Sequence, residues 1–540
     1  MEREDPRIRV NQAGYRLTDS KRFVAACAGG RFEIRREAGG QAVYAGELAG
    51  PAADEASGEG VYEGDFSSLR EEGTYRVFVP GAGESLPFRV DAQAYRSVTD
   101  ALLKCFYFQR CGMELEAPYA GVWTHKACHL GLARVHGEEE VMLPQTGGWH
   151  DAGDYGKYTV AAAKAAADLL LAFETFPAAF GRTIGIPESG NGVPDLLNEV
   201  RYELEFLLRM QRPDGSVFHK VTTERFPALD AMPEDDAAEL VFSPVSAAAA
   251  GAFAASMAMA ARAFRAYDAG FSDTCLEAAV RAWEWLEAAP DRTGFRNPAD
   301  IHTGEYGDET TDDEAYWAAA ELFRTTGRDV YRDAFRSAFE SARFPLYELG
   351  WADVGGYGTL AVLLTESGRI GADIRDRLLR GWMDRADELK ARCDRGGYRI
   401  SLTPDQYIWG SNMVLMNQAM HLIFASKFSG DSAYEDAARN HWDYLLGVNP
   451  LGLSYVTGIG ARAVRHPHHR PSVGDGIEDP VPGMVAGGPN RNLQDEAAKR
   501  ELQGRPPALC FVDDRDSYST NEMTIYWNSP AVFVSACFEG

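Results

Sequence analysis

The chain has 540 residues, of which 45% are hydrophobic and 25% charged, and its formal net charge is −26 at pH 7. This length predicts two or more domains, and the composition is that of a globular rather than a disordered protein. Acidity can serve solubility alone, but it disfavours nucleic acid and anionic membranes as partners, and a neutral substrate fits it best.

The start of the chain, Met-Glu-Arg-Glu-Asp-Pro, lacks the charged-then-apolar pattern of a signal segment. No stretch is long and apolar enough to span a bilayer, because the Ala-rich run 247–261 is short and interrupted by Gly251 and Ser256. We therefore expect a cytoplasmic protein. The eight cysteines have no short-range disulfide spacing, and most should be reduced core residues.

Residues 7 to about 92 have the pattern of β-structure. Apolar and polar residues alternate in segments such as 32–34 and 75–79, and Gly-rich turns such as 38–40 separate them. Short strands at this spacing predict a small sandwich, which we assign to residues 1–92.

From Ala94 onward the hydrophobic period becomes helical. We expect twelve helical stretches, which begin near Tyr95, Lys157, Pro194, Pro244, Ser272, Asp312, Val330, Tyr357, Ile374, Trp409, Ser432 and Asn521. The strand–helix alternation of a parallel sheet is absent, so residues 93–540 favour a toroid of helical hairpins. A plain bundle or a solenoid is the alternative, although no short repeat supports a solenoid.

Two aspartates, Asp151 and Asp154, lie in a Gly-rich segment just before a long Ala-rich helical stretch. The glycines bar a regular helix there. One of the two acids could be a helix N-cap. Two exposed acids, with Trp149 before them and Tyr155 and Tyr158 after them, favour a sugar site, where rings stack on pyranose faces and a carboxylate activates water.

Four potential metal ligands form a Cys-x16-Cys-His-x20-His pattern, namely Cys111, Cys128, His129 and His150. Taken singly, each is more commonly a buried core residue or a helix-end histidine. Cysteine and histidine are nevertheless the ligands of tetrahedral zinc, and the pattern ends beside Asp151. Together they favour a closed structural metal site that ties down the acidic loop and leaves no open position for catalysis.

Two further acidic loops, 187–195 and 307–314, precede helical stretches. Hard oxygen ligands in a flexible loop suit calcium, but neither loop follows the EF-hand pattern. Capping acids in a solvated loop explain each one equally well.

Near the C-terminus, Glu522 lies at the predicted start of an apolar helix. It is either an N-terminal acid favoured by the helix dipole or a catalytic acid whose pKa is raised by apolar neighbours such as Tyr526 and Trp527. Upstream, the segment 467–470, Pro-His-His-Arg, could donate hydrogen bonds to sugar hydroxyls, although surface basic clusters are common.

Three of these motifs resemble glycoside hydrolase family 9, and they occur in the order of that family. They are Asp-Ala-Gly-Asp at 151–154, Ser-Tyr-Val-Thr-Gly at 454–458 running to Pro-His-His-Arg at 467–470, and Asn-Glu at 521–522. The opening segment 9–15 resembles the immunoglobulin-like module of one branch of the family. The resemblance implies an immunoglobulin-like β-sandwich in residues 1–92 and an all-α (α/α)6 barrel in residues 93–540.

The resemblance further implies a glycoside hydrolase that cleaves β-1,4-glucosidic bonds in soluble glucans or cello-oligosaccharides with inversion. Asp154 matches the catalytic base, Asp151 the residue that helps to hold the water, and Glu522 the general acid. The positions that match substrate-binding residues are His468, Arg470, Trp409, Trp527, Tyr518 and His219. The segment 461–466 lacks the asparagine often found there, which leaves the subsites undefined.

Structural metals are also implied by the resemblance. In the branch with the immunoglobulin-like module, two cysteines and two histidines bind zinc, and Cys111, Cys128, His129 and His150 fall on that pattern. Structural calcium is expected at two sites, with Glu188, Asn191 and Asp195 at one and Glu309, Asp312, Asp313 and Asp353 at the other.

Two alternatives to a β-1,4-glucanase or cellodextrinase remain. The first is an exo-β-glucosaminidase that acts on chitosan oligosaccharides, for which extra acids would pair with the glucosaminyl ammonium. The second is a carbohydrate-binding protein with a dead site, which the presence of Asp151, Asp154 and Glu522 disfavours. We expect a monomer whose partner is an oligo- or polysaccharide rather than nucleic acid or a membrane.

Overall fold

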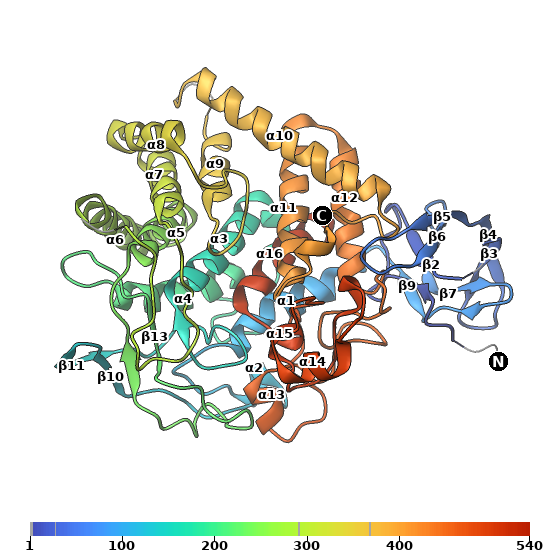
Figure 1. The fold of residues 1–540 in the computed structure, drawn as a ribbon, viewed down its shortest axis with the longest axis horizontal. Coiled ribbons are helices and arrows are strands. Elements are labelled where there is room, and N and C mark those ends of the chain that lie inside the picture. The colour runs from blue at the N-terminus through green and yellow to red at the C-terminus, as the bar shows by residue number, and fades with distance from the viewer. Residues whose placement is uncertain (1–3, 28, 290–291, 367–368, 540) are drawn as a thin grey trace. The chain divides into compact units, whose positions relative to one another are not determined.

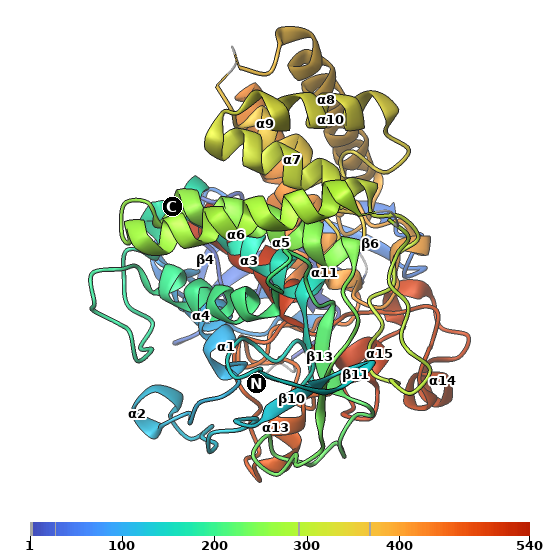
Figure 2. The ribbon, with the colours of Figure 1, turned by 90° about the vertical axis from the view of Figure 1, so that its left-hand side faces the viewer.

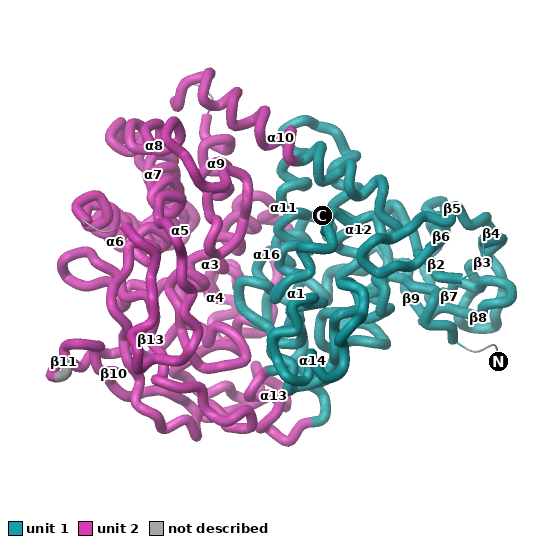
Figure 3. Tube along the Cα trace, viewed as in Figure 1, with its two compact units in different colours: residues 1–105, 386–468, 478–540 teal, residues 106–385, 469–477 magenta. Residues whose placement is uncertain are grey.

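The computed structural model describes residues 4–27, 29–289, 292–366 and 369–539 (Figures 1 and 2). The chain forms two compact units, shown in Figure 3: unit 1 holds 1–105, 386–468 and 478–540, and unit 2 holds 106–385 and 469–477. This division differs from the predicted domains 1–92 and 93–540, because the β-sandwich shares a unit with the C-terminal helices.

The N-terminal part of unit 1 is the predicted β-sandwich. Its strands are β1 (Ile8–Arg9), β2 (Arg22–Ala25), β3 (Arg31–Arg36), β4 (Ala42–Glu47), β5 (Ala49–Ala53), β6 (Gly60–Asp65), β7 (Gly73–Val79), β8 (Gly83–Glu84) and β9 (Phe88–Val90). One sheet has the order β1-β2-β6-β5, and the other has the order β4-β3-β7-β8 with β9 also on β7. In β7 alternate residues Tyr75, Val77 and Val79 are buried, which is the period-2 pattern that the sequence showed.

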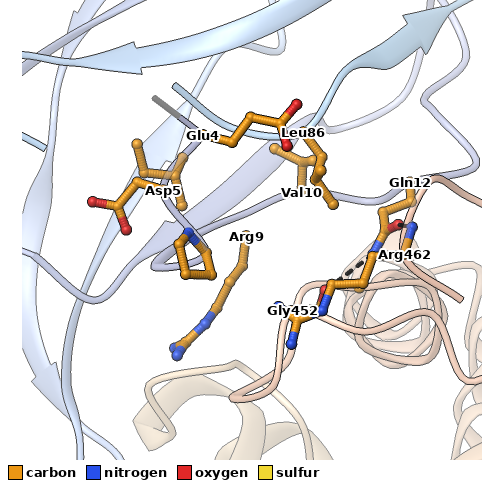
Figure 4. Close-up of a pocket in the computed structure, with 11 residues that line it drawn as sticks. Glu4, Asp5, Arg9, Val10, Gln12, Leu86, Gly452 and Arg462 are labelled. Carbon is orange, nitrogen blue, oxygen red and sulfur yellow. Dashed lines mark hydrogen bonds between the residues drawn. The ribbon is translucent and has the colours of Figure 1, made fainter. Parts of the chain in front are cut away.

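The opening segment 9–15 fastens this sandwich to the helical part of unit 1. The Asn11 side-chain amide donates to Asp443 Oδ1 at 2.7 Å, and Gln12 Oε1 accepts from the Arg462 backbone N–H at 2.7 Å. A cavity of about 170 Å³ lies beside these contacts, lined by Arg9 and Val10 of the sandwich and by Gly452 and Arg462 (Figure 4). None of the predicted catalytic carboxylates lines it.

The helices of unit 1 follow the predicted pattern. They include α1 (Arg96–Phe108, which continues into unit 2), α11 (Ser411–Ser429), α12 (Ser432–Leu445), α14 (Glu496–Leu502), α15 (Tyr518–Asn521) and α16 (Ile525–Glu539). Helix α11 packs against α12 and α16, and it is buried along most of its length. A helix covered on most sides has no separate polar face, and in α11 the polar residues such as Asn412 and His421 are buried among the apolar ones.

Unit 2, magenta in Figure 3, contains the remaining helices. They are α2 (Ala117–Ala120), α3 (Thr159–Thr175), α4 (Asp195–Met210), α5 (Ala247–Phe264), α6 (Ala269–Ala288), α7 (Asp312–Thr326), α8 (Asp329–Ser341), α9 (Gly355–Leu363), α10 (Ala372–Arg395, which continues into unit 1) and α13 (Arg470–Gly474). Helix α5 packs against α3, α6 and α7. Its small residues permit this close approach, since a Cβ on Gly251 would lie 2.6 Å from the Glu314 side chain.

Helix α5 is also long and apolar enough to pass a length-and-hydropathy test for a membrane span, contrary to the expectation that no stretch would. The core helix of a soluble protein passes the same test, and 94% of its apolar window is buried inside the protein.

A five-stranded sheet in unit 2 was not predicted. Its order is β11 (Glu138–Pro144), β10 (Leu132–Val135), β14 (Leu240–Phe242), β13 (Lys220–Thr223) and β12 (Lys157–Tyr158). All four residues of β13 are buried, so the strand has no polar–apolar alternation to reveal it. Strand β12 runs directly into α3. The sheet therefore supports the chain that immediately follows the acidic loop.

Each of the twelve predicted helical stretches corresponds to a helix. The predicted starts mostly lie within a few residues of the observed ones, but the last helix, α16, begins at Ile525 rather than near Asn521. The predicted fold class, a β-sandwich followed by a helical domain, is confirmed, with the small sheet as an addition within the helical part.

Candidate active site

The acidic loop of unit 2 owes its path to two glycines. Gly147 and Gly148 have φ angles of 102° and 76°, and a Cβ on Gly148 would lie 2.5 Å from the Phe206 ring. Only glycine adopts this backbone without strain. The turn leads to Asp151 and Asp154, which are 2% and 6% exposed. The two acids were expected to be exposed, and the structure instead buries both carboxylates.

Asp151 is held by a tyrosine from a distant loop. The Tyr306 hydroxyl donates to Asp151 Oδ2 at 2.6 Å, and the Asp151 backbone N–H donates to the Gly156 carbonyl at 2.9 Å. Its second oxygen, Oδ1, has no hydrogen-bond partner among the described residues. Burial, reinforced by the charge of Asp154, raises the pKa of Asp151 well above its usual range. An oriented carboxylate with a spare buried oxygen is equipped to hold a water.

Asp154 accepts hydrogen bonds from its own loop. Its Oδ2 accepts from the Gly156 backbone N–H at 2.9 Å and from the Tyr158 hydroxyl at 3.4 Å. Burial raises its pKa above the ordinary value of 3.8, although the positive charges of Arg470 and Lys220 oppose this effect. A carboxylate with a raised pKa is a stronger base than an exposed one.

Arg470, which was expected to bind sugar, grips the acidic loop from within unit 2. Its Nη1 donates to the Gly153 carbonyl at 2.8 Å, and its Nε and Nη2 donate to the Pro227 carbonyl at 3.2 and 3.1 Å. Most of its side chain is buried. The structure therefore gives Arg470 a positioning role beside Asp154, and sugar binding by Arg470 stays a prediction.

Gln109 supports the same loop from the end of α1. Its side-chain amide donates to the carbonyls of His150 and Ala152 at 3.0 and 2.8 Å. Its Oε1 is paired with His469 Nε2 at 3.0 Å, so that His469 in turn orients Gln109. The two side chains fix the backbone on both sides of Asp151.

Tyr306 is a contact of Asp151 that the sequence did not reveal. It lies 155 positions after Asp151, and its φ of 47° places a non-glycine residue in the left-handed region. Such strained backbone clusters at functional sites. Its ring lies 4.8 Å from Tyr158 and 4.9 Å from Trp351, centroid to centroid. The unusual φ and the packed ring aim the hydroxyl at Asp151.

The four predicted metal ligands meet at one place in unit 2. Ligand atoms of Cys111, Cys128, His129 and His150 all lie within 4.8 Å of one another. The Cys111 sulfur is 3.8 Å from His129 Nδ1, and the Cys128 sulfur is 4.0 Å from His150 Nε2. A tetrahedral zinc with bonds of roughly 2.0–2.3 Å holds its ligand atoms only slightly closer together. The number, chemistry and spacing of the donors therefore fit zinc.

An acid beyond these ligands supports the same interpretation. His129 Nε2, the nitrogen that faces away from the sulfurs, lies 3.3 Å from Asp236 Oδ2. A carboxylate that orients a ligating histidine is a common partner in zinc sites. His129 also has a φ of 50°, which the surrounding contacts must maintain.

The candidate acid Glu522 lies in unit 1. It has extended backbone between α15 and α16 rather than a place in the first turn of a helix, which corrects the sequence-based expectation. Glu522 pairs with His468 in a parallel bridge, and the His468 backbone N–H donates to the Asn521 carbonyl at 3.0 Å. Asn521 in turn donates to the carbonyl of His466 at 2.6 Å. This bridge, together with the hydrogen bonds of Asn521, fixes the backbone of Glu522.

Two aromatic rings in unit 1 are exposed, as a sugar platform requires. Trp409 and Tyr518 are 38% and 36% exposed, with ring centroids 5.3 Å apart. The Tyr518 ring lies 6.0 Å from His468, whose Nδ1 is paired with the Arg515 carbonyl at 2.7 Å. This arrangement brings three of the predicted substrate-binding residues together with the backbone of Glu522.

Two predicted substrate-binding residues are core residues instead. Trp527 is 2% exposed, and Cβ atoms on Gly410 and Gly487 would each lie 2.9 Å from its ring. His219 is completely buried, with its Nδ1 on the Ser246 hydroxyl at 2.8 Å and its Nε2 on the Glu305 carbonyl at 3.1 Å. Neither ring offers a free face to a sugar, because packing that the sequence does not show encloses both.

The loop 187–195 uses its oxygens within the protein. Both Glu188 oxygens accept from Arg110 at 3.0 Å, and Asp195 Oδ2 accepts from the Ile184 N–H at 2.7 Å and from the Ser189 hydroxyl at 2.6 Å. The Asn191 amide donates to Asn198 Oδ1 at 3.0 Å. Calcium at Glu188, Asn191 and Asp195 stays a prediction, and the observed bonds favour a self-supporting loop.

The second acidic loop has a different set of acids from the one predicted. Glu309 and Asp312 are exposed, whereas Asp313 and Glu314 are buried and each has an oxygen without a partner among the described residues. Burial and neighbouring acids raise the pKa of Asp308, Asp313 and Glu314, and burial raises that of Asp353. Unpaired buried oxygens beside other acids suit a cation. Calcium at Glu309, Asp312, Asp313 and Asp353 stays a prediction, and the unpaired oxygens favour Asp313 and Glu314 within the predicted loop.

Most glycoside hydrolases use a pair of carboxyl groups as acid and base. The candidates for these roles are the buried aspartates Asp151 and Asp154 in unit 2 and Glu522 in unit 1. The family model of glycosyl hydrolase family 9 matches residues 95–535, and that of the cellulase N-terminal ig-like domain matches residues 3–84. The chain belongs to glycosyl hydrolase family 9.

Relatives with similar sequences extend over nearly the whole chain. A cellodextrinase of Butyrivibrio fibrisolvens is 37% identical and is matched over 98% of both chains. Endoglucanase D of Acetivibrio thermocellus is 36% identical over 99% of this chain and 83% of its own length.

Solved structures of family 9 endoglucanases have the same fold as this chain. A single mutant of a thermostable endoglucanase from Alicyclobacillus acidocaldarius has a TM-score of 0.94 at 45% identity and covers 98% of this chain and 99% of its own. A Zn-binding triple mutant of the family 9 endoglucanase J30 has a TM-score of 0.92 at 34% identity, over 97% of this chain and 99% of its own. The predicted fold class, an immunoglobulin-like sandwich followed by an (α/α)6 barrel, is confirmed.

Proposed function

We propose that this protein is an inverting β-1,4-glucanase that hydrolyses soluble glucans and cello-oligosaccharides. The observation that carries the proposal is the buried pair Asp151 and Asp154, held by Tyr306 and Arg470 on a glycine-shaped loop. The names of the relatives, a cellodextrinase and endoglucanases, favour β-1,4-glucan as the substrate. The exo-β-glucosaminidase alternative draws no support from them.

The chemical roles follow from the environment of each carboxyl. Asp154 accepts a proton from the attacking water, because its buried carboxylate has a raised pKa. Asp151 holds the same water, with one oxygen fixed by Tyr306 and the other without a protein partner. Glu522 gives the leaving glycosidic oxygen its proton. Inversion follows when water rather than a carboxylate attacks the sugar carbon.

Trp409 and Tyr518 are proposed to bind a glucosyl unit. Exposed aromatic rings bury the apolar face of a pyranose, and these two rings lie next to each other. His468 is proposed to donate a hydrogen bond to a sugar hydroxyl beside them. A platform of two rings suits a short soluble chain as readily as a polymer.

Two structural metals are proposed. Cys111, Cys128, His129 and His150 would hold zinc, which would crosslink the acidic loop without entering the chemistry, since four protein ligands close its coordination. Calcium would be held by the buried acids Asp313 and Glu314 of the second acidic loop, together with the half-buried Asp308 and the exposed Asp353.

One product profile tests the proposed function. Purified protein is incubated in parallel with cellopentaose and with a chitosan oligomer of the same length, and products are separated by chromatography. We expect cellobiose and cellotriose from the first and no cleavage of the second. Glu522→Gln should abolish turnover of cellopentaose while retaining its binding, measured by calorimetry. Cleavage of only the chitosan oligomer would assign the glucosaminidase activity instead.

A further inference from the structure

Strand β13 holds the segment that carries Tyr306. The Lys220 ammonium donates to the Gly304 carbonyl at 2.6 Å and to the Thr303 hydroxyl at 3.1 Å. The Thr222 hydroxyl lies 2.8 Å from the same Thr303 hydroxyl. Two residues of one buried strand, Lys220 and Thr222, therefore hold residues 303–304 in place. This segment ends two positions before Tyr306, whose backbone is strained.

Lys220 is an unusual residue for this structural task. Its side chain is completely buried, and it forms no ion pair with an acid in the described part of the chain. Burying an ammonium group without a paired carboxylate is costly, and a neutral donor would make the same bonds to a carbonyl and a hydroxyl. The hydrogen bonds to Thr303 and Gly304 therefore do not explain why the residue at position 220 is positively charged.

An electrostatic effect on Asp154 explains why a charged residue occupies position 220. The charges of Asp154 and Lys220 act on each other: Lys220 favours the ionised carboxylate, and Asp154 favours the ammonium form. The Lys220 ammonium also lies 5.5 Å from the centre of the Tyr158 ring, whose hydroxyl contacts Asp154.

The other charged and titratable groups around this pair have opposing effects. Arg470 also favours ionised Asp154, and Asp151 lies beside Asp154. Glu305 adds a negative charge near Lys220, and His219, which precedes it, is kept neutral by burial. Two cations, Arg470 and Lys220, thus act on Asp154, and Lys220 is the one that also holds the Tyr306 segment.

We propose that Lys220 is a positioning residue of the water-activating site, whose ammonium group fixes the segment carrying Tyr306 and keeps Asp154 ionised. The inference rests on the proposed role of Asp154 as the base. Lys220 does not touch the substrate in this account. Its loss should therefore lower kcat and change the pH dependence while leaving KM within about twofold.

The pH profile of kcat/KM on cellopentaose tests the proposal. Asp154 works ionised, so removal of a nearby positive charge moves the acidic limb of the profile to higher pH. Lys220→Met should shift this limb upward by about one pH unit and lower kcat about tenfold or more. Lys220→Arg, which keeps the charge, should keep the limb within a few tenths of a unit. Thr222→Val, which removes a contact to Thr303 but no charge, is the matched control and should not shift it.

The outcomes separate this inference from the proposed function. Turnover by the wild-type protein and its loss in Asp154→Ala test the function itself. If both results hold and a folded Lys220→Met variant keeps the wild-type acidic limb, the proposed role of Lys220 is wrong.

A second measurement serves if Lys220→Met does not fold. The Lys220 side chain is labelled with ¹³C at Cε, identified by comparison with Lys220→Arg, and titrated by NMR in the wild type and in Asp154→Asn. Burial lowers the pKa of Lys220 to about 7, and Asp154 opposes this effect. The midpoint should therefore fall by about one pH unit in Asp154→Asn. An unchanged midpoint would overturn the proposal.

Discussion

Tyr306 shows at the scale of a single residue how the site depends on contacts that are remote in the chain. Its hydroxyl is the side-chain donor to Asp151 Oδ2. A hydrogen bond to a charged group contributes about 1.5–3 kcal/mol, so we expect Tyr306→Phe to lower kcat roughly 10- to 100-fold with little change in KM. Tyr155→Phe is the control, because within the described part of the chain this hydroxyl bonds only to the Ala231 carbonyl. Equal kcat values for Tyr306→Phe and the wild type would contradict the proposed role of Asp151 in holding the water.

Glu203 makes the support of the loop sensitive to pH. It is buried in α4 and accepts from the Trp149 backbone N–H, and burial raises its pKa to about 8. A raised pKa means that the folded protein binds a proton that the unfolded chain releases above the ordinary value of 4.5. Its contribution to stability is therefore present at low pH and is lost as the pH rises towards 8.

We expect Glu203→Gln to reduce the loss of stability that occurs as the pH rises towards 8. Thermal midpoints measured between pH 5 and 8 should fall less steeply in the variant than in the wild type, because glutamine keeps the acceptor but has no proton to lose. Glu205→Gln, on the exposed face of the same helix, should retain the wild-type slope. Parallel curves for Glu203→Gln and the wild type would contradict the assignment.

The acidic loop is the element that the metal ligands hold, because His150 directly precedes Asp151. We expect purified wild-type protein to contain about one zinc per chain by elemental analysis, and Cys128→Ser to contain much less. The variant should unfold at a lower temperature and lose activity through disorder of the loop. Cys275→Ser, at a buried cysteine outside the cluster, should keep the zinc. Wild-type protein free of zinc would refute this site.

Local spacing made part of this element predictable. Asp151, Asp154 and the four candidate metal ligands were predicted, with roles that stay predictions, because glycine turns and Cys–His spacing are visible in the sequence. Tyr306 and Lys220 were not, since each acts on residues at least 60 positions away through contacts that only the fold creates. Trp527 and His219 were misassigned for the converse reason, as their burial depends on neighbours such as Gly410 and Phe295.

At the scale of the whole molecule, the opening segment explains why the sandwich belongs with the C-terminal helices. Asn11 donates to Asp443, a carboxyl whose pKa burial raises to about 7. We expect Asn11→Ala to leave this buried acid without a donor and to lower the free energy of unfolding by about 1–3 kcal/mol. Asn492→Ala, at an exposed site in the same unit, should change it by less than about 0.5 kcal/mol. If urea titrations gave the two variants the same loss in free energy of unfolding, the role of Asn11 in joining the sandwich to the C-terminal helices would be contradicted.

The most direct test of the account is the anomer that appears first. Freshly cleaved cellopentaose is followed by proton NMR, before mutarotation mixes the anomers, with wild-type protein and with Asp154→Ala as the inactive control. If Asp154 activates water opposite the leaving oxygen, the new reducing end is the α-anomer. Initial release of the β-anomer would show that a covalent intermediate forms, and would contradict the assignment of Asp154 as the base.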